Sequence, residues 1–328
     1  MDYFPKSTPA QQQMDPALFA QAAKSAADLP NLYSYLVLRN GHLVHEYYAQ
    51  DNTRSTKHHI RSITKSITSI LTGIAIDQGI IKHVDQRILD YFPQVPTDTI
   101  DSKVKDITLE HLLTMTSGFA WDEGSEEAVV EWFFGGKQVA ITDSLTRSVE
   151  HEPGSHFNYD SPSADLLATL LAIAMQNDLC RFAIQHLFNP LDIHDFEWER
   201  DPAGYYRGSA GLVMRPIDLA KIGQLTLQNG QWQEQQIVSK EWVEQSVVTQ
   251  AIANQESGYG RLWWVKENEP PRFYAAVGYG GQFITVAPEQ QIIIVAIHEW
   301  WDLPSGSAGK QSTDFNSQVL TKVLESAI

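Results

Sequence analysis

The chain has 328 residues, of which 43% are hydrophobic and 20% charged, an ordinary composition for a globular protein of one large or two medium-sized domains. Its formal net charge of −16 argues against nucleic acid and anionic membranes as partners. The single cysteine, Cys180, leaves no internal disulfide and fits a reducing compartment. Residues 1–16 lack the layout of a signal peptide and no apolar run reaches the length of a membrane span, so we expect a cytoplasmic protein.

Two local signals organise the first fifty residues. Asp15-Pro16 is a helix cap followed by a proline at the first helical position, which predicts an alanine-rich helix over residues 17–27. Residues 33–39 and 42–48 have the composition of strands, and Asn40-Gly41 between them is the strongest short-range signal for a β-hairpin. We therefore expect a helix followed by a hairpin.

Residues 60–79 are the most informative stretch of the sequence. Isoleucines recur there at helical spacing and Gly79 follows the last turn, which predicts one buried helix. Ser62 lies at its first turn, close to free backbone N–H groups and the positive end of the helix dipole. Lys65 lies one turn on, on the same face. Because a desolvated lysine can act as a base near neutral pH, this pair is a candidate nucleophile and its base.

The Ser-x-x-Lys spacing is weak evidence by itself. A chain of this length contains on the order of one such pair by chance. A second copy, Ser307 to Lys310, occurs in a Gly/Ser-rich stretch that we interpret as a loop. The spacing at the start of an apolar helix is stronger evidence, but the hypothesis needs partners from elsewhere in the chain.

The middle of the chain, residues 84–205, is predicted to be mostly helical. Helical patterns cover residues 106–117, 163–175 and 179–187. Residues 121–134 mix acids with aromatics, which is compatible with a solvated helix face over an aromatic core stripe or with the aromatic wall of a pocket.

Strand patterns return in the last third of the chain. Helices are predicted over residues 216–228, 239–248 and 312–327, and strands over residues 259–266, 273–277, 282–287 and 291–298. The economical fold is α+β: one antiparallel sheet from N- and C-terminal strands, flanked by the terminal helices, with an inserted mostly helical subdomain. The sheet domain is predicted to comprise residues 1–83 and 206–328, and the helical subdomain residues 84–205.

A turn in the helical subdomain offers one partner for Ser62. Residues 153–161 lead into the helix predicted from residue 163, and would present Tyr159 and Ser161 from a loop. The phenol of Tyr159 can shuttle a proton. A buried packing tyrosine is the alternative interpretation.

A glycine-rich segment at the start of a predicted strand offers a second partner for Ser62. Tyr279-Gly280-Gly281 precedes the strand that begins at Gln282. Glycines let a backbone approach a ligand closely, and a strand edge beside a nucleophile can donate an N–H group to an oxyanion. A simple strand-entry bulge is the alternative.

The order of these stretches, with several longer blocks, resembles the serine β-lactamase and penicillin-binding protein superfamily over nearly the whole chain. The likeness is to its class C-like branch of esterases, amide hydrolases and β-lactamase-related proteins. The blocks are TKSITSILTGIAIDQGII, ITLEHLLTMTSGF, GSAGLVMRPIDLAKIGQLTLQNGQW and GYGGQFITVAPEQQIIIV, and the form FNYDSPSADLL resembles the 6-aminohexanoate-dimer hydrolase type.

The resemblance implies roles for individual residues. Ser62 resembles the acylated serine, Lys65 its paired lysine, and Tyr159 the tyrosine of the Tyr-x-Asn motif, with Ser161 where asparagine is usual. Tyr279-Gly280-Gly281 resembles the third motif, Lys-Thr-Gly in β-lactamases, and its residues are implied to bind substrate together with Ser161.

Two consequences for the chemistry follow from these positions. The N–H groups of Ser62 and Gln282 would form the oxyanion hole. The absence of the third-motif lysine weighs against β-lactamase and transpeptidase activity and favours an ester or a linear amide.

The sequence therefore predicts a serine hydrolase that cleaves an ester or linear amide through an acyl-enzyme on Ser62. Two alternatives stay open: a β-lactamase or D-alanyl-D-alanine carboxypeptidase-like enzyme, and a non-catalytic penicillin-binding-like protein that binds a ligand. The substrate would be a small ester, amide or peptide, and a homodimer is left open. We expect no cofactor and no metal, because His58 and His59 have no further ligands at suitable spacing and are interpreted as loop residues.

Overall fold

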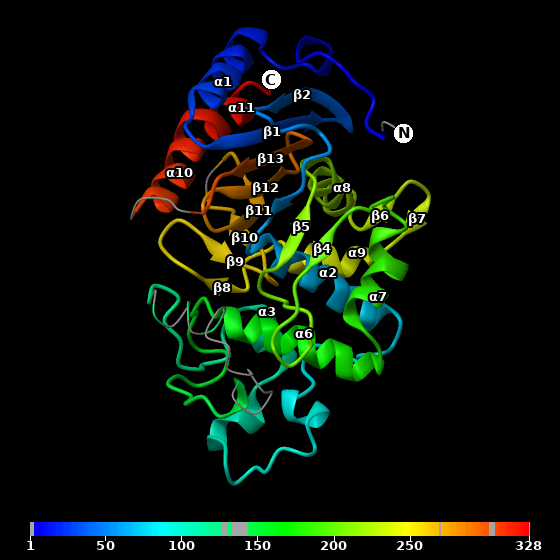
Figure 1. Cartoon of the computed structure of the whole chain (residues 1–328), viewed down its shortest axis with the longest axis vertical. Helices are drawn as coiled ribbons and strands as arrows, with labels where there is room; N and C mark the ends of the chain where they lie inside the picture. The colour runs from blue at the N-terminus through cyan, green and yellow to red at the C-terminus, as the bar shows by residue number, and fades with distance from the viewer. Residues whose placement is uncertain are drawn as a thin grey trace.

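A computed structural model describes residues 3–125, 127, 130, 132, 144–268, 270–301 and 306–327. Its centre is an antiparallel sheet of eight strands in the order β2-β1-β13-β12-β11-β10-β9-β8, flanked by helices (Figure 1). The strands are β1 (Leu32–Arg39), β2 (His42–Tyr48), β8 (Ala251–Ile252), β9 (Gly258–Tyr259), β10 (Trp264–Lys266), β11 (Phe273–Gly278), β12 (Gln282–Ala287) and β13 (Ile292–His298). The predicted α+β fold is confirmed.

The middle of the sheet joins the two ends of the chain. Strand β1 pairs antiparallel with β13, with Tyr35 opposite Ala296 and Leu38 opposite Ile293. The predicted hairpin β1–β2 is present, and both turn residues, Asn40 and Gly41, have positive φ of 50° and 73°, the backbone conformation that a two-residue hairpin turn requires.

Helices cover both faces of the sheet. On one face lie α1 (Pro16–Asp28), α10 (Ser307–Phe315), the π-helical turn η5 (Asn316–Leu320) and α11 (Thr321–Glu325), which form one apolar cluster with the strands (Figure 1). On the other face lie α8 (Pro216–Leu227) and α2 (Ile63–Asp77), within a larger core that continues into the remaining helices. Asp15 caps α1 by accepting hydrogen bonds from two backbone N–H groups, as predicted.

Helix α2 runs through the interior of the molecule. Residues 63–75 are all buried, so the helix has no solvent face. Two of its hydroxyl side chains hydrogen-bond to other segments: Thr68 Oγ1 donates to the carbonyl of Gly208 at 3.0 Å, and Ser66 Oγ to that of Leu262 at 2.6 Å. Gly73 allows close packing, because a Cβ there would lie 2.4 Å from the ring of Trp242. The start of α2 is thereby rigidly positioned.

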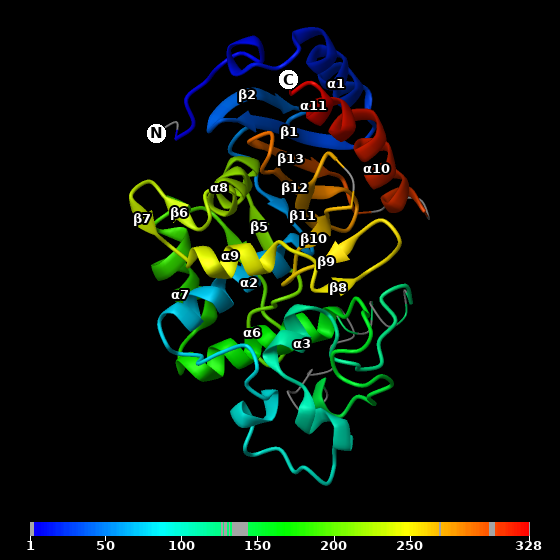
Figure 2. The same ribbon diagram turned by 180° about the vertical axis from the view of Figure 1, so that it is seen from behind.

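Below α2, on the side away from the sheet, lie α3 and α6 (Figures 1 and 2). The other helical elements are η1 (Ala10–Gln12), η2 (Ile88–Tyr91), η3 (Ser102–Asp106), α3 (Leu109–Leu113), α6 (Ser161–Met175), α7 (Leu179–Ala183), η4 (Ile184–Phe188) and α9 (Lys240–Ser246). Two small sheets complete the described structure: β3 (His58–His59), β5 (Leu212–Met214) and β4 (Glu197–Trp198), and the pair β6 (Gln231–Trp232) and β7 (Gln235–Gln236). The subdomain boundaries at residues 83 and 206 remain a prediction.

Several predicted elements need correction. The strand predicted over 259–266 is two strands, β9 and β10, because a turn at residues 260–263 interrupts it. Helix α6 begins at Ser161 instead of residue 163, because Asp160 caps it and Pro162 occupies its first turn. The stretch from Ser307 to Lys310 is the first turn of α10, not a loop.

Two more interpretations change or fall outside the description. His58 and His59 form strand β3 by pairing with β5, and are not loop residues. Of residues 121–134, the description omits 126, 128, 129, 131, 133 and 134, so the aromatic stripe predicted there lies largely outside it.

Among the described residues, no single helix is both long and apolar enough to cross a membrane. Helix α6 and the segment Leu179–Phe188 together have the length and apolar composition of a membrane span, but the pair is bent by 81°.

Candidate active site

Ser62 and Lys65 lie together at the start of α2. Ser62 is the residue before the first helical turn, and its side chain makes no capping hydrogen bond. The Lys65 amine Nζ lies 3.0 Å from Ser62 Oγ, and Lys65 is 1% exposed. A cap residue whose hydroxyl is turned toward a lysine instead of the helix backbone is arranged for chemistry at the expense of helix capping.

Lys65 has two further partners from distant parts of the chain. Its Nζ lies 3.0 Å from Ser161 Oγ, at the start of α6, and 3.0 Å from the carbonyl oxygen of Ser209. Three oxygen atoms therefore surround the amine, which is the number of hydrogen-bonding positions that a lysine amine has. The structure brings Ser161, predicted to bind substrate, into direct contact with the lysine.

Ser161 is held in turn by Glu123. Ser161 Oγ donates to Glu123 Oε1 at 2.6 Å, and its backbone N–H donates to Oε2 at 3.3 Å. The Trp121 indole N–H also donates to Glu123 Oε2. Because the single hydroxyl proton of Ser161 goes to Glu123, the Ser161 oxygen faces Lys65 as an acceptor. Glu123 was interpreted from sequence as part of a solvated helix face or pocket wall, whereas it lies in a turn and is committed to this chain of hydrogen bonds.

Tyr159 lies beside Lys65 on an aromatic wall. Its ring stacks on Trp264 with centroids 5.7 Å apart, and contacts Tyr259 edge-on. Lys65 Nζ lies 4.8 Å from the centre of the Tyr159 ring. Within the described part of the chain, the Tyr159 hydroxyl hydrogen-bonds to no protein group. Phe157 extends the wall by packing against Tyr259 and Trp264.

The segment that carries Tyr159 and Ser161 is fixed by the residue between them. Asp160 is buried, caps α6 through the Ser163 N–H, and accepts two hydrogen bonds from Arg147 at 2.9 and 3.0 Å. Both bonds come from one guanidinium nitrogen, Arg147 Nη1, to the two carboxylate oxygens, and they are charge-assisted. They position the side chains on either side of Asp160.

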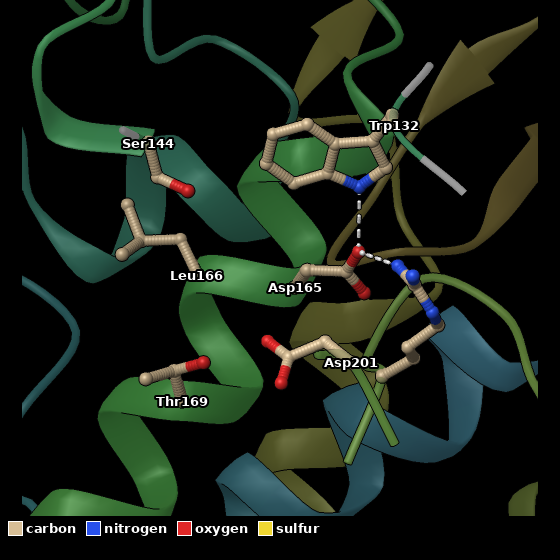
Figure 3. Close-up of a pocket in the computed structure, with 7 residues that line it drawn as sticks. Trp132, Ser144, Asp165, Leu166, Thr169 and Asp201 are labelled. Carbon is tan, nitrogen blue, oxygen red and sulfur yellow. Dashed lines mark hydrogen bonds and ion pairs between the residues drawn. The ribbon is translucent and has the colours of Figure 1, made fainter. Parts of the chain in front are cut away.

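A second buried carboxylate supports the Ser209 carbonyl. Asp165 Oδ1 accepts the Ser209 N–H at 2.8 Å, while Oδ2 accepts from the indole of Trp132 at 2.8 Å and from Arg207 at 3.3 Å (Figure 3). These groups line a cavity of about 10 Å³, with room for at most one water, together with Ser144, Leu166, Thr169 and Asp201. None of the predicted site residues line this cavity. The hydrogen bonds of Asp165 hold Ser209 in place beside the site.

The glycine segment requires glycine for close packing. Gly280 and Gly281 have φ of 81° and 90°, and a Cβ at each would lie 2.6 Å from Trp300 Cβ and 2.9 Å from His298 Nδ1, respectively. Tyr279, in contrast, is 60% exposed at the rim. The backbone of Gly280 and Gly281 therefore packs directly against Trp300 and His298.

Gln282 and His298 hold Gly280 and Gly281 in place by hydrogen bonds. The Gln282 side-chain amide donates to the carbonyls of His298 at 3.0 Å and Gly280 at 3.3 Å. His298 Nδ1 lies 2.6 Å from the Gly281 carbonyl, so this nitrogen carries the proton and donates. Burial lowers the pKa of His298 to about 4.

The predicted oxyanion donors, the N–H groups of Ser62 and Gln282, lie on segments that contact each other. Within the described residues, the Ser62 N–H donates to no protein acceptor, so it is available to a ligand. Gln282 lies opposite Gly278 at the end of the β11–β12 pair, and a Cβ at Gly278 would lie 2.5 Å from the Ile60 carbonyl. The start of α2 and the end of this strand pair are therefore in contact.

Sequence reasoning missed Glu123, Ser209 and Asp165. Glu123 is one of several acids in its stretch, and nothing local distinguishes it. A signal existed for Ser209 and Asp165, which lie in the blocks GSAGLVM and FNYDSPSADLL that carry part of the family resemblance. Among the described residues, no group of three or more His, Cys, Asp or Glu side chains is placed to hold a metal ion.

The fold is that of the serine β-lactamases and penicillin-binding proteins. Its marks are an antiparallel sheet flanked by helices and a buried helix that starts with Ser62 and Lys65. A family profile described as Beta-lactamase matches residues 19–310. The chain belongs to this family.

Several known proteins are similar to this chain. The 6-aminohexanoate-dimer hydrolase of Paenarthrobacter ureafaciens is 24% identical over 288 residues, which cover 82% of this chain and 73% of that protein. Among solved structures, one of a candidate 6-aminohexanoate-dimer hydrolase from Bacillus anthracis has a TM-score of 0.79 at 18% identity, covering 98% of this chain and 88% of the other. EstCE1, described as a hydrolase with promiscuous acyltransferase activity, has a TM-score of 0.71 at 15% identity, covering 93% and 97%. The structural likenesses establish the fold.

Proposed function

We propose that this β-lactamase-family hydrolase is a serine hydrolase that cleaves an ester or linear amide through an acyl-enzyme on Ser62. The single observation that carries the proposal is the environment of Lys65. Its amine is buried, lies 3.0 Å from the hydroxyl of Ser62, and has two other oxygen neighbours that are both restricted to accepting from it.

Counting donors and acceptors shows why this environment suits a base. Ser161 Oγ gives its proton to Glu123, and the Ser209 carbonyl has no proton, so both accept N–H groups from Lys65. A neutral amine has two N–H groups for these partners, and its lone pair then points to the Ser62 hydroxyl. After Lys65 takes the Ser62 proton, the ammonium has three N–H groups and three acceptors. Neither protonation state leaves a buried polar group unpaired.

Acylation follows from this arrangement. Lys65 accepts the Ser62 proton as the oxygen attacks the substrate carbonyl, and the carbonyl oxygen becomes an oxyanion. The Ser62 and Gln282 N–H groups would stabilise the oxyanion, and losing one such donor typically reduces the rate by about 10²–10³-fold. The proton passes from Lys65, directly or through the Tyr159 hydroxyl, to the leaving alcohol or amine. The C–O or C–N bond breaks and the acyl group stays on Ser62.

Deacylation reverses these steps with water as the nucleophile. Lys65, again neutral, takes a proton from water as the water oxygen attacks the acyl-enzyme. The same N–H groups hold the second oxyanion, and Ser62 leaves with the proton from Lys65. The Tyr159 hydroxyl, with no hydrogen bond to a described protein group, is available to carry the proton in either half-reaction.

The choice of ester or linear amide over β-lactam rests on two facts. Proteins similar to this chain include a 6-aminohexanoate-dimer hydrolase, whose named substrate consists of two amino-acid units that an amide can join, and a hydrolase with promiscuous acyltransferase activity. This chain also has Tyr279 where the β-lactamases have the lysine of the third motif. We therefore expect an acyl-enzyme from short-chain esters and slow or no turnover of penicillins.

Intact-mass spectrometry tests the proposal directly. The protein is incubated separately with a short-chain p-nitrophenyl ester and with a penicillin, and the mass increase is assigned to a residue by peptide mapping. We expect a transient acyl adduct on Ser62 from the ester and none in Ser62→Ala. Ester turnover that persists in Ser62→Ala, or an adduct on another residue, contradicts the mechanism. Rapid nitrocefin turnover would instead support the β-lactamase alternative.

A further inference from the structure

Arg61, the residue immediately before Ser62, is a cation that pairs with no carboxylate among the described residues. Its backbone has φ of 52°, a left-handed conformation that is uncommon for a non-glycine residue. The backbone is held there by hydrogen bonds: the Arg61 N–H donates to His59 Nδ1 at 3.2 Å, and its carbonyl accepts from Thr64. Within the described residues, the guanidinium makes no hydrogen bond or ion pair, and its buried Nε has no partner.

An aromatic shelf holds the guanidinium in place. The Arg61 guanidinium carbon lies 4.2 Å from the centre of the Trp300 ring. Trp300 itself packs on Gly280, and Arg61 Cβ would lie 3.1 Å from a Cβ at Gly278. Arg61 thus lies between the nucleophile and the glycine segment. Stacking occupies the face of a guanidinium and leaves its N–H groups, which lie along the edge, free to bind a planar anion.

The acidic groups nearby do not neutralise Arg61. Burial lowers the pKa of the Arg61 guanidinium, and the fields of Glu199, Tyr279 and Glu123 act in the opposite direction. Glu199 is paired with His59, with Oε1 3.5 Å from Nε2, and Glu123 is committed to Ser161. A largely buried cation is costly when unpaired, because burial removes its hydration without supplying a counter-charge. The arrangement is suited to an anion that arrives with the ligand.

We propose that Arg61 binds a carboxylate of the substrate, so that the hydrolase prefers esters or amides with a carboxylate near the scissile bond. This inference rests on the proposed function, since it assigns the substrate class of the Ser62 site. The carboxylate belongs either to the acyl part or to the leaving group. Tyr279 supplies a phenol on the strand side, and Arg61 supplies the positive charge from the helix side.

Two pairs of esters separate the two sources of the carboxylate. Mono-p-nitrophenyl glutarate and p-nitrophenyl pentanoate have acyl chains of equal length that end in a carboxylate or a methyl group. The butyrate esters of 4-hydroxybenzoate and 4-hydroxybenzamide differ in the same way on the leaving group. We expect one pair to show a lower KM for the carboxylate member with the wild-type protein. In Arg61→Met, that KM should rise by roughly 10- to 100-fold more than the KM of the neutral member, as for the loss of charge-assisted hydrogen bonds.

Two further variants decide between binding and general effects. Arg61→Lys keeps the charge but not the planar fork, and should recover part of the preference. Arg200→Met is the matched control, because Arg200 also stacks on a ring, that of Tyr206 at 4.0 Å, but pairs with Asp178. The control should leave the KM ratio of both pairs unchanged. Equal KM changes for the charged and neutral members of both pairs in Arg61→Met would show a structural role and overturn the inference.

Calorimetric binding separates the failure of this inference from the failure of the proposed function. Ser62→Ala is titrated with the same esters, and compared with the double variant Ser62→Ala/Arg61→Met. Preferential binding of a carboxylate ester that disappears in the double variant supports the anion site even if Ser62 is not the nucleophile. Binding that does not distinguish charged from neutral esters overturns the anion site even if Ser62 forms an acyl-enzyme.

Discussion

Two Ser-x-x-Lys sequences begin α-helices in this molecule, and only one has the environment of an active site; a third, Ser102 to Lys105, lies in the short 3₁₀ helix η3. Ser62 and Lys65 start α2, and Ser307 and Lys310 start α10. Lys65 is buried with three oxygen neighbours, whereas the Lys310 side chain is 74% exposed and pairs with Asp314 one turn along the same helix. Spacing and secondary structure are shared, so the difference lies in burial and in partners from distant segments.

Replacing the two serines tests this comparison most strongly. Ser62→Ala should reduce kcat/KM for a p-nitrophenyl ester by on the order of 10³-fold or more, because no nucleophile remains to form the acyl-enzyme. Ser307→Ala should retain the wild-type value. Both are measured with the same ester and with labelling by a fluorophosphonate. Labelling of Ser62→Ala at an intensity equal to that of the wild type would show that the reactive nucleophile is another residue.

Replacing the two lysines should have the next largest effect. Lys65→Met keeps the length of the side chain but removes the base, and we expect kcat to fall by about 10²–10⁴-fold. Lys310→Met removes only a solvated ion pair, which typically contributes about 0–1 kcal/mol to stability, and should not change kcat. Melting temperatures of both variants establish that they fold. A Lys65→Met variant that folds and retains full activity would leave proton transfer to another group.

Removing the link between Lys65 and Glu123 should have a smaller effect. Ser161→Ala deletes the hydroxyl that accepts from Lys65 and donates to Glu123, and we expect a 10- to 100-fold loss in kcat through misplacement of the amine. Glu123→Gln should reduce kcat by less. Because Glu123 is expected to act on Lys65 through the Ser161 hydroxyl, the double variant should resemble Ser161→Ala alone. Additive losses would show that Glu123 acts independently of Ser161.

A different kind of effect, on stability and not on activity, is expected near the glycine segment, where His298 also contacts Phe315 of α10. The pKa of His298 is lowered to about 4 by burial, from an ordinary value of 6.5. Between these values the unfolded chain binds the proton and the folded chain does not, so acid favours unfolding. The contribution of His298 is fully present above pH 6.5 and is lost as the pH falls toward 4, by up to about 3 kcal/mol.

Urea unfolding at pH 7 and pH 5 measures this effect. His45, His58 and His111 are partly buried and also have lowered pKa values, so the difference between wild type and His298→Gln isolates one histidine. The wild type should lose more stability than the variant between the two pH values. Parallel losses would assign the effect to the other groups.

Local signals predicted the elements well where the cause was local. The Asp15 cap, the Asn40-Gly41 turn and the isoleucine stripe of α2 each specify their structure within a few residues, and all three are confirmed. The first turn of α10 was missed, because Gly306 with φ of 78° starts a helix after a stretch whose composition is typical of a loop.

The site was predictable only in part, for a related reason. The geometry of Ser62 with Lys65 follows from one helical turn, so spacing sufficed. The contacts of Lys65 with Ser161 and Ser209 join positions 96 and 144 residues away, and no local pattern encodes them. The roles of Tyr159, Gln282 and the glycine segment came from family resemblance and remain predictions, as does a homodimer.

The pairing of β1 with β13 has a consequence for biosynthesis. The first long strand of the sheet finds its central partner only after nearly the whole chain has been synthesised, and contacts of such high sequence separation form slowly. Gln282, the predicted oxyanion donor, begins β12, which lies between β11 and β13 in the same sheet. Helix α2 therefore leaves the ribosome more than 200 residues before Gln282 does, and a nascent chain contains Ser62 and Lys65 long before the predicted oxyanion donor.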